Sequence, residues 1–86
     1  MPEISRFLGM IIRMYYDDHA PPHFHVRYGE HEAVISILDL ACLTGRLPPK
    51  AMGLVIEWAS AHRAELEEDW ALACQDLPLK AILPLE

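Results

Sequence analysis

The sequence predicts one α+β domain over residues 1–86, in which a small antiparallel β-meander of three to four strands packs against one long or bent C-terminal helix. Two patterns predict this class. The first half of the chain alternates apolar and polar residues, as half-buried strands do. Residues 50–75 contain no proline and one glycine, and their apolar residues recur every three or four positions, as in a helix. The proline-punctuated end of the chain predicts an extended C-terminal tail.

Composition and net charge restrict the classes of function that are open to this chain. Apolar residues make up 52% of the 86 residues, which is enough for a packed core and too much for a disordered chain. A chain of this length buries only about 60% of the surface that its unfolded form exposes, so a partner would add to its stability. Thirteen acidic and seven basic residues give a net charge of −6, which does not favour nucleic acid as the partner.

Neither a membrane segment nor a secretion signal is predicted. No stretch approaches the roughly 20 apolar residues that a membrane helix needs, and the N-terminus lacks a basic start followed by an apolar core. We therefore expect a cytoplasmic protein without membrane contact. Cys42 and Cys74 show no C-x-x-C spacing, so we expect reduced and mostly buried thiols.

The first predicted strand lies within residues 7–16, where alternation divides the side chains between two faces. The apolar face holds Met10, Ile12, Met14 and Tyr16, and the opposite face holds Ile11, Arg13 and Tyr15. Asp17 and Asp18 end the run. Pro21 and Pro22 then make the link to the next strand a stiff turn, because each fixes its own φ angle.

Residues 23–28 alternate throughout and predict a second strand. Its apolar residues are Phe24, Val26 and Tyr28, and its polar residues are His23, His25 and Arg27. A short turn leads to a third strand over residues 32–38, and a weaker extended piece follows at residues 40–43, before a turn at Thr44-Gly45. Because the connections are short, neighbouring strands are expected to pair antiparallel.

The helix is predicted to begin at Pro48-Pro49, because a proline in the first helical turn loses no intrahelical hydrogen bond. Its buried stripe consists of Met52, Val55, Ile56, Ala59, Leu66, Trp70 and Ala73. A straight helix over residues 48–75 would be about 42 Å long, which is long for so small a domain. We therefore expect a bend near residues 60–63, and the sequence leaves open whether residues 48–75 form one helix or two.

Three of the five histidines lie in residues 17–28, beside two of the acidic residues. If the helix covers the apolar face of the strands, the polar side chains form one surface on the other side. We predict that this is a binding surface, formed by Arg13, Tyr15, Asp18, His19, His23, His25 and Arg27. Glu32 and Ser36 share this face if the third strand keeps the alternation.

A divalent metal site is one use of this surface. Two histidines separated by one residue on a strand point to the same side, a spacing that strand-borne metal sites use. A third ligand could come from the turn, as Asp17, Asp18 or His19, and the leading candidate ligands are His19, His23 and His25. The neighbouring arginines would repel a divalent cation. No other cofactor is predicted.

The same groups suit an anion or a protein partner. Arg13 and Arg27 can hold a phosphate or a carboxylate through charge-assisted hydrogen bonds. Because histidine titrates near neutral pH, His23 and His25 are the candidate catalytic residues of a small phosphodiesterase or nuclease. Arginine and aromatic side chains are also enriched in protein interfaces. These residues alone leave the three uses open.

Five segments read M-P-E-I-S-R-F, M-Y-Y-D-D-H-A-P-P-H-F-H-V-R-Y-G-E, L-P-P-K-A, E-W-A-x-x-H-R-x-E-L-x-x-x-W and L-P-L-K-x-I-x-P-L. Together they cover essentially the whole chain and resemble a family of small bacterial proteins classed as domain of unknown function 4160. The signature of that family falls here on Tyr15, Tyr16, Asp18, His19, Pro21, Pro22, His23, Phe24 and His25.

The resemblance implies a protein partner rather than a known reaction. Such proteins are often encoded beside another small protein and carry a toxin-antitoxin or regulatory label. We therefore expect a cytoplasmic binding or regulatory module that contacts a small protein partner. A small metal- or histidine-dependent phosphodiesterase or nuclease is the alternative. A homodimer is also compatible with the unpaired edges of a small sheet.

Overall fold

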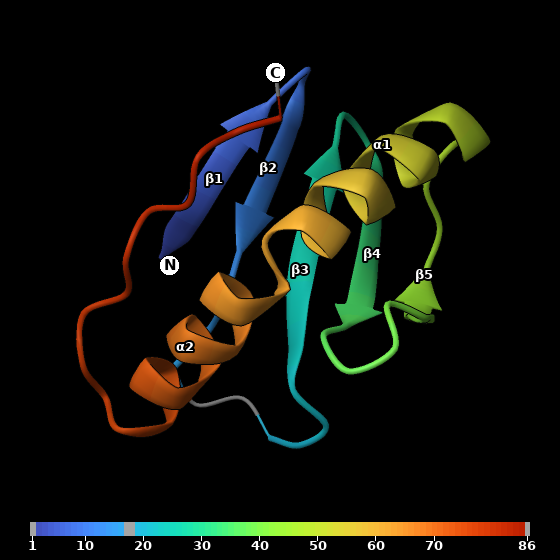
Figure 1. The fold of residues 1–86 in the computed structure, drawn as a ribbon. Coiled ribbons are helices and arrows are strands. Elements are labelled where there is room, and N and C mark those ends of the chain that lie inside the picture. The colour runs from blue at the N-terminus through green and yellow to red at the C-terminus, as the bar shows by residue number, and fades with distance from the viewer. Residues whose placement is uncertain (1, 17–18, 86) are drawn as a thin grey trace.

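Five strands and two helices form the fold in the computed structural model, which describes residues 2–16 and 19–85 (Figure 1). The strands are β1 (Glu3–Phe7), β2 (Met10–Arg13), β3 (His23–Tyr28), β4 (His31–Ser36) and β5 (Cys42–Gly45), and the helices are α1 (Pro49–Ala61) and α2 (Arg63–Cys74). Each strand pairs antiparallel with the next, in the order β1-β2-β3-β4-β5. The α+β class is confirmed, with five strands instead of the expected three to four.

The additional strand is β1. Alternation predicts a single strand within residues 7–16, but Leu8 and Gly9 form a tight turn between β1 and β2. Both residues have positive φ angles, 48° for Leu8 and 81° for Gly9, as a two-residue hairpin turn of this kind requires. Because Leu8 is apolar, the turn is hidden in the hydrophobic pattern of the sequence.

The two faces of the sheet divide as alternation predicts. Five apolar side chains of β2, β3 and the adjoining segment are at most 1% exposed, namely Met10, Ile12, Met14, Phe24 and Val26. Trp58 of α1 is fully buried above them, with its ring centroid 5.3 Å from that of Phe7 and 6.0 Å from that of Phe24. Both helices lie on this side of the sheet (Figure 1).

The expected bend is a break between the two helices at His62. This residue has φ −120° and ψ 25°, and its backbone N–H donates to the carbonyls of Trp58 (3.1 Å) and Ala59 (3.2 Å). A straight helix of about 42 Å would exceed the 33 Å extent of the domain along its longest axis. Residues 48–75 therefore contain two helices, and neither of these described helices has the length and apolar character needed to cross a membrane.

The C-terminal tail lies along β1 of its own chain (Figure 1). The N–H of Ile82 donates to the carbonyl of Ile4 (2.7 Å), and the indole Nε1–H of Trp58 donates to the carbonyl of Leu83 (2.8 Å). The side chain of Ile82 is buried in the core. The tail thus covers the outer edge of β1 and belongs to the folded body.

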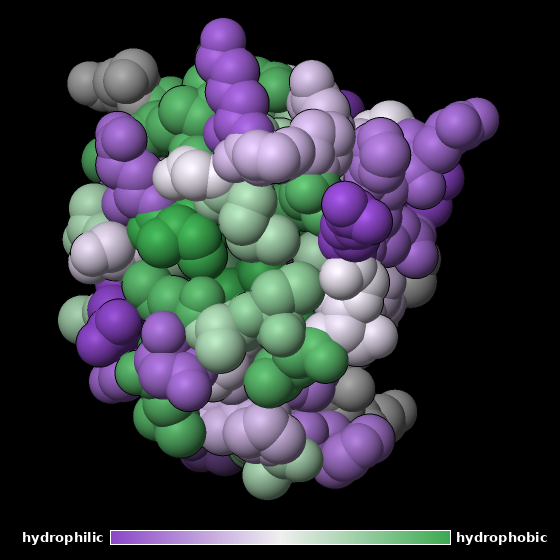
Figure 2. All heavy atoms as spheres, turned by 90° about the vertical axis from the view of Figure 1, so that its right-hand side faces the viewer, coloured by the Kyte–Doolittle hydropathy of each residue, from purple (hydrophilic) through white to green (hydrophobic). Residues whose placement is uncertain are grey.

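The outer edge of β5 is open by contrast. Within the described part of the chain, β5 pairs only with β4, and all four of its residues are exposed. Hydrophobic side chains gather on the surface seen from the β5 side (Figure 2). Leu43 of β5 is 46% exposed, and Leu38, in the segment before β5, is 60% exposed. Open strand edges can pair with another chain, so this is the edge at which the homodimer, still a prediction, would form.

The two cysteines are free thiols, as expected, but both are exposed rather than buried. Cys42 begins the edge strand β5, and Cys74 ends α2. Their positions at the margins of the fold account for the difference from the expected burial.

Candidate functional site

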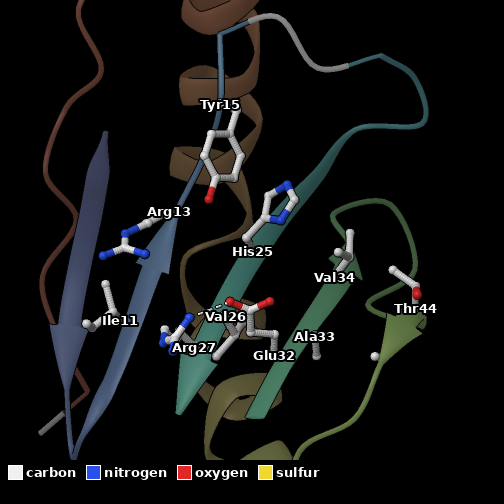
Figure 3. A pocket seen from close by; sticks show the side chains of 11 residues that line it. Ile11, Arg13, Tyr15, His25, Val26, Arg27, Glu32, Ala33, Val34 and Thr44 are labelled. Carbon is white, nitrogen blue, oxygen red and sulfur yellow. Dashed lines mark hydrogen bonds and ion pairs between the residues drawn. The ribbon is translucent and has the colours of Figure 1, made fainter. Parts of the chain in front are cut away.

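The face of the sheet opposite the helices carries a depression of about 180 Å³, seen in Figure 3 with the helices behind the sheet. This open-face depression runs from β2 across β3 and β4 to β5. It is lined by Ile11, Arg13, Tyr15, His25, Val26, Arg27, Glu32, Ala33, Val34, Thr44 and Gly45. Four of the predicted binding residues, Arg13, Tyr15, His25 and Arg27, therefore lie together.

Strand register brings the polar side chains of the depression into contact range. Arg13 of β2 pairs with His25 of β3, and Arg27 of β3 pairs with Glu32 of β4. Residues opposite each other in an antiparallel pair have Cβ atoms about 4.5–5.5 Å apart. Tyr15, just beyond β2, packs edge-on to His25, with ring centroids 4.4 Å apart and an interplanar angle of 88°.

Among the described residues, one of the two arginines of the depression forms an ion pair and the other does not. Nη1 of Arg27 lies 2.7 Å from Oε1 of Glu32. Glu3 pairs in register with Arg13, but its carboxylate accepts two hydrogen bonds from Arg6, at 2.7 and 3.1 Å. Arg13 is half-buried and makes no hydrogen bond or ion pair with any residue that the structure describes.

The pKa of Glu3 is consistent with its hydrogen bonds from Arg6. It is lowered from its ordinary value, chiefly by the hydrogen bond from Arg6, and the positive charges of Arg6 and Arg13 lower it further. The carboxylate beside Arg13 is thus committed to another arginine, and the Arg13 guanidinium remains available to a ligand.

His23 packs toward α2 instead of lining the depression. It is 7% exposed, and its ring centroid lies 5.1 Å from that of Trp70. Its Nδ1 lies 2.7 Å from the carbonyl oxygen of Pro21, which can only accept, so this hydrogen bond requires the proton on Nδ1. Ser36, its register partner on β4, is also buried. His23 and His25 therefore occupy different surroundings, although their ring centroids are 5.2 Å apart.

The other predicted site residues do not line the depression. His19 is exposed in the turn before β3, and Asp18 lies outside the described residues. Within residues 2–16 and 19–85, no three His, Cys, Asp or Glu side chains are grouped so that they could hold a metal ion. Metal binding by His19, His23 and His25 stays a prediction.

Sequence reasoning missed the side of the depression that β5 forms. The sequence predicts a turn at Thr44-Gly45, but these residues end β5, which pairs with β4 next to a register shift between Val34 and Ile35. A Cβ atom on Gly45 would lie 2.2 Å from the carbonyl oxygen of Glu32, and Gly45 has a φ of +80°. Only glycine permits this close approach, so Gly45 was the signal that the strand continues past the expected residues 40–43.

The fold and the site define a class: a small α+β domain with one helix-covered sheet face and one open face that carries a polar depression. The chain belongs to the family described as domain of unknown function DUF4160, whose family model matches residues 9–71. The family predicted from the sequence is thereby confirmed over residues 9–71. Every residue that lines the depression falls in the matched range. No curated protein and no solved structure matches the chain.

Proposed function

We propose that this domain is a binding module that contacts a protein partner through the open face of its sheet. The observation that carries the proposal is the open-face depression, in which arginine, histidine and tyrosine side chains stand beside exposed parts of apolar residues. Arginine and tyrosine are enriched in protein interfaces and often supply a large part of the binding energy.

The position of the core supports this use of the open face. The largest fully buried side chains of the sheet point toward the helices, and Trp58 packs on them from α1. Ile11 and Val34 on the open face remain half-buried. A partner seated here would bury these apolar side chains further without disturbing the core.

The setting that we propose is a regulatory pair of small proteins in the cytoplasm. The small protein encoded beside members of this family is the first candidate partner, as the toxin-antitoxin-like label of the family implies. A complex would also suit a domain of 86 residues, because short chains bury a small fraction of their surface on their own.

The alternative, a phosphodiesterase or nuclease that uses His23 and His25, requires both rings to reach one substrate. His25 lines the depression, whereas His23 is packed against Trp70 and bonded to Pro21. A general acid or base must come within about 2.6–3.2 Å of the atom whose proton it transfers. The burial of His23 therefore favours the binding proposal over a hydrolase.

A capture experiment with three forms of the protein tests the proposal. Tagged wild type, a face variant (Tyr15→Ala, Arg27→Gln) and a control variant (Arg63→Gln, Leu83→Ala) are expressed in the native host, and retained proteins are identified by mass spectrometry. The control also removes one charge and one large side chain, but from exposed positions outside the depression. Circular dichroism checks that all three forms are folded.

We expect one small protein to be retained in equal amounts by the wild type and the control. The face variant should retain at least tenfold less, because its two substitutions remove an aromatic contact and a charge from the interface. Retention of no protein by the wild type, or equal retention by the wild type and the face variant, would contradict the proposal.

A further inference from the structure

We propose that the open-face depression holds a carboxylate of the partner, the side chain of an aspartate or glutamate, with Arg13 as the anchoring cation. This inference rests on the proposed binding function, and it names the group that the partner presents to this face.

The first step is the charge balance of the depression. Arg27 and Glu32 neutralise each other at 2.7 Å, whereas Arg13 has no counter-ion among the described residues. Among the described residues that line the depression, one positive charge is therefore unbalanced, although the whole chain has a net charge of −6. A guanidinium presents its N–H donors in a planar fork that matches the two oxygens of a carboxylate.

The second step is the group of side chains around Arg13. Tyr15 and His25 pack edge-on at 4.4 Å, and Figure 3 shows the Tyr15 hydroxyl directed between Arg13 and His25. A phenol hydroxyl can donate to an anionic oxygen. The partial burial of Arg13 also reduces the screening of its charge by water.

The third step is the choice among anions. The depression holds about 180 Å³. Sites for small molecules and cofactors usually hold about 300–1,000 Å³, so this one suits a single side chain. A phosphate group with two negative charges would also be repelled by the carboxylate of Glu32 in the same depression. One carboxylate matches the one unbalanced charge, and Ile11 and Val34 offer apolar contact to its methylene groups.

Titration of the isotope-labelled full chain, followed by nuclear magnetic resonance, tests the inference. The probe is acetyl-glutamate amide, which carries one carboxylate on a side chain, and acetyl-glutamine amide is its neutral match. Inorganic phosphate is the third probe, and sodium chloride keeps the ionic strength constant. The signals followed are the Nε–H groups of Arg13 and of Arg63, an exposed arginine on α2.

We expect the glutamate probe to shift the Arg13 signal in a saturable way, with a Kd on the order of millimolar, because the bidentate ion pair acts together with the Tyr15 hydroxyl and the apolar contacts of the depression. The glutamine probe and phosphate should bind at least fivefold more weakly. Arg13→Gln should abolish the effect, Arg13→Lys should weaken it because the fork is lost, and Arg63→Gln should leave it unchanged.

Four results would overturn the inference. They are the absence of a saturable shift at Arg13, equal binding of the glutamine probe, phosphate binding as tight as that of glutamate, and an unchanged affinity in the Arg13→Gln variant. The spectrum of each variant away from the depression shows whether the fold is intact.

This titration and the capture experiment can fail separately. The capture depends on Tyr15 and Arg27, whereas the titration depends on Arg13. If the titration fails while the face variant still loses its partner, the carboxylate inference is wrong and the binding proposal stands. If no partner depends on the open face, the proposed function itself is wrong.

Discussion

The two faces of the sheet come from the same strands, yet one is dry and covered and the other is polar and open. On β3, Phe24 is fully buried beside Trp58, whereas the next residue, His25, lies in the open-face depression and is half-buried. Because successive side chains of a strand point to opposite faces, one short segment supplies both the core and the candidate binding surface. Substitutions at neighbouring positions should therefore change different properties of the protein.

The largest effect is expected on the covered face. Phe24→Ala should lower the free energy of unfolding by about 3–5 kcal/mol, because it removes a large buried side chain and leaves a cavity under Trp58. The matched variant His25→Ala on the open face should lower it by less than about 1 kcal/mol. Urea unfolding followed by circular dichroism measures both values. Equal losses of unfolding free energy at Phe24 and His25 would contradict the assignment of the core to one face of the sheet and of binding to the other.

The next largest effect is expected where the tail is fastened to the covered side. Asp69 is 1% exposed, and its Oδ1 accepts the backbone N–H of Lys80 at 2.9 Å. Asp69→Ala leaves this N–H without its acceptor and should cost about 1–3 kcal/mol. Asp69→Asn keeps an acceptor oxygen and serves as the control, with a smaller loss or none.

Hydrogen exchange shows whether the loss comes from the tail. The amide of Ile82, which bonds to Ile4, should exchange faster in Asp69→Ala than in Asp69→Asn. Unchanged stability and unchanged exchange in Asp69→Ala would mean that the tail is held by its apolar contacts alone.

A smaller effect is expected in the pH dependence of stability. Burial raises the pKa of Asp69 above its ordinary value of 3.8, although the hydrogen bond from Lys80 opposes this. The folded protein therefore binds this proton more tightly than the unfolded chain does, so the contribution of Asp69 to stability is present below pH 3.8 and is lost as the pH rises through the folded pKa. The wild type should gain stability relative to Asp69→Asn as the pH falls from 7 toward 4.

Other carboxylates do not disturb this comparison. The pKa of Asp39 is lowered, chiefly by the hydrogen bond from the backbone N–H of Ala41, and that of Glu3 is lowered by Arg6. Both groups titrate in the wild type and in the variant, so their effects cancel in the difference. A difference in stability that is independent of pH between 4 and 7 would contradict the raised pKa of Asp69.

The smallest change in stability is expected on the open face, at Glu32→Gln. The Arg27–Glu32 pair is well exposed, with 50% and 69% of the two side chains accessible, and such pairs contribute about 0.2–1 kcal/mol. The free energy of unfolding should change by less than about 0.5 kcal/mol. Anion selectivity should change more, because Arg27 would lose its counter-ion and phosphate should then bind better. Phosphate affinity equal to that of the wild type would show that Glu32 plays no part in selectivity.

The sequence predicted what depends on local alternation and missed what depends on positive φ angles or tertiary packing. The faces of β2 and β3 follow from the period of two, and the helix break follows from the length of residues 48–75. The turn at Leu8-Gly9 was hidden because an apolar leucine occupies one of its two positions. Strand β5 was expected only as a weak extended piece at residues 40–43, and its continuation through Thr44 and Gly45 was missed because it depends on the close approach at Gly45.

The same division applies to the candidate site. Arg13, Tyr15, His25 and Arg27 lie together because strand register places them, and alternation is sufficient to predict that. His23 was assigned to the same face, but alternation does not specify where α2 lies after the break at His62, and Trp70 of α2 packs on its ring. The carboxylate of Glu3 bonds to Arg6 instead of Arg13. Alternation could not predict this either, because it depends on the pairing of β1 with β2.

The most direct test of the central claim measures binding and stability on the same samples. Isothermal titration calorimetry gives the Kd of the captured partner for the wild type and for the face variant Tyr15→Ala, Arg27→Gln, and urea unfolding gives the stability of both. The open face is predicted to serve binding, so the Kd should rise at least tenfold while the free energy of unfolding changes by less than about 1 kcal/mol. An unchanged Kd, or a loss of affinity fully explained by a loss of folded protein, would contradict this account.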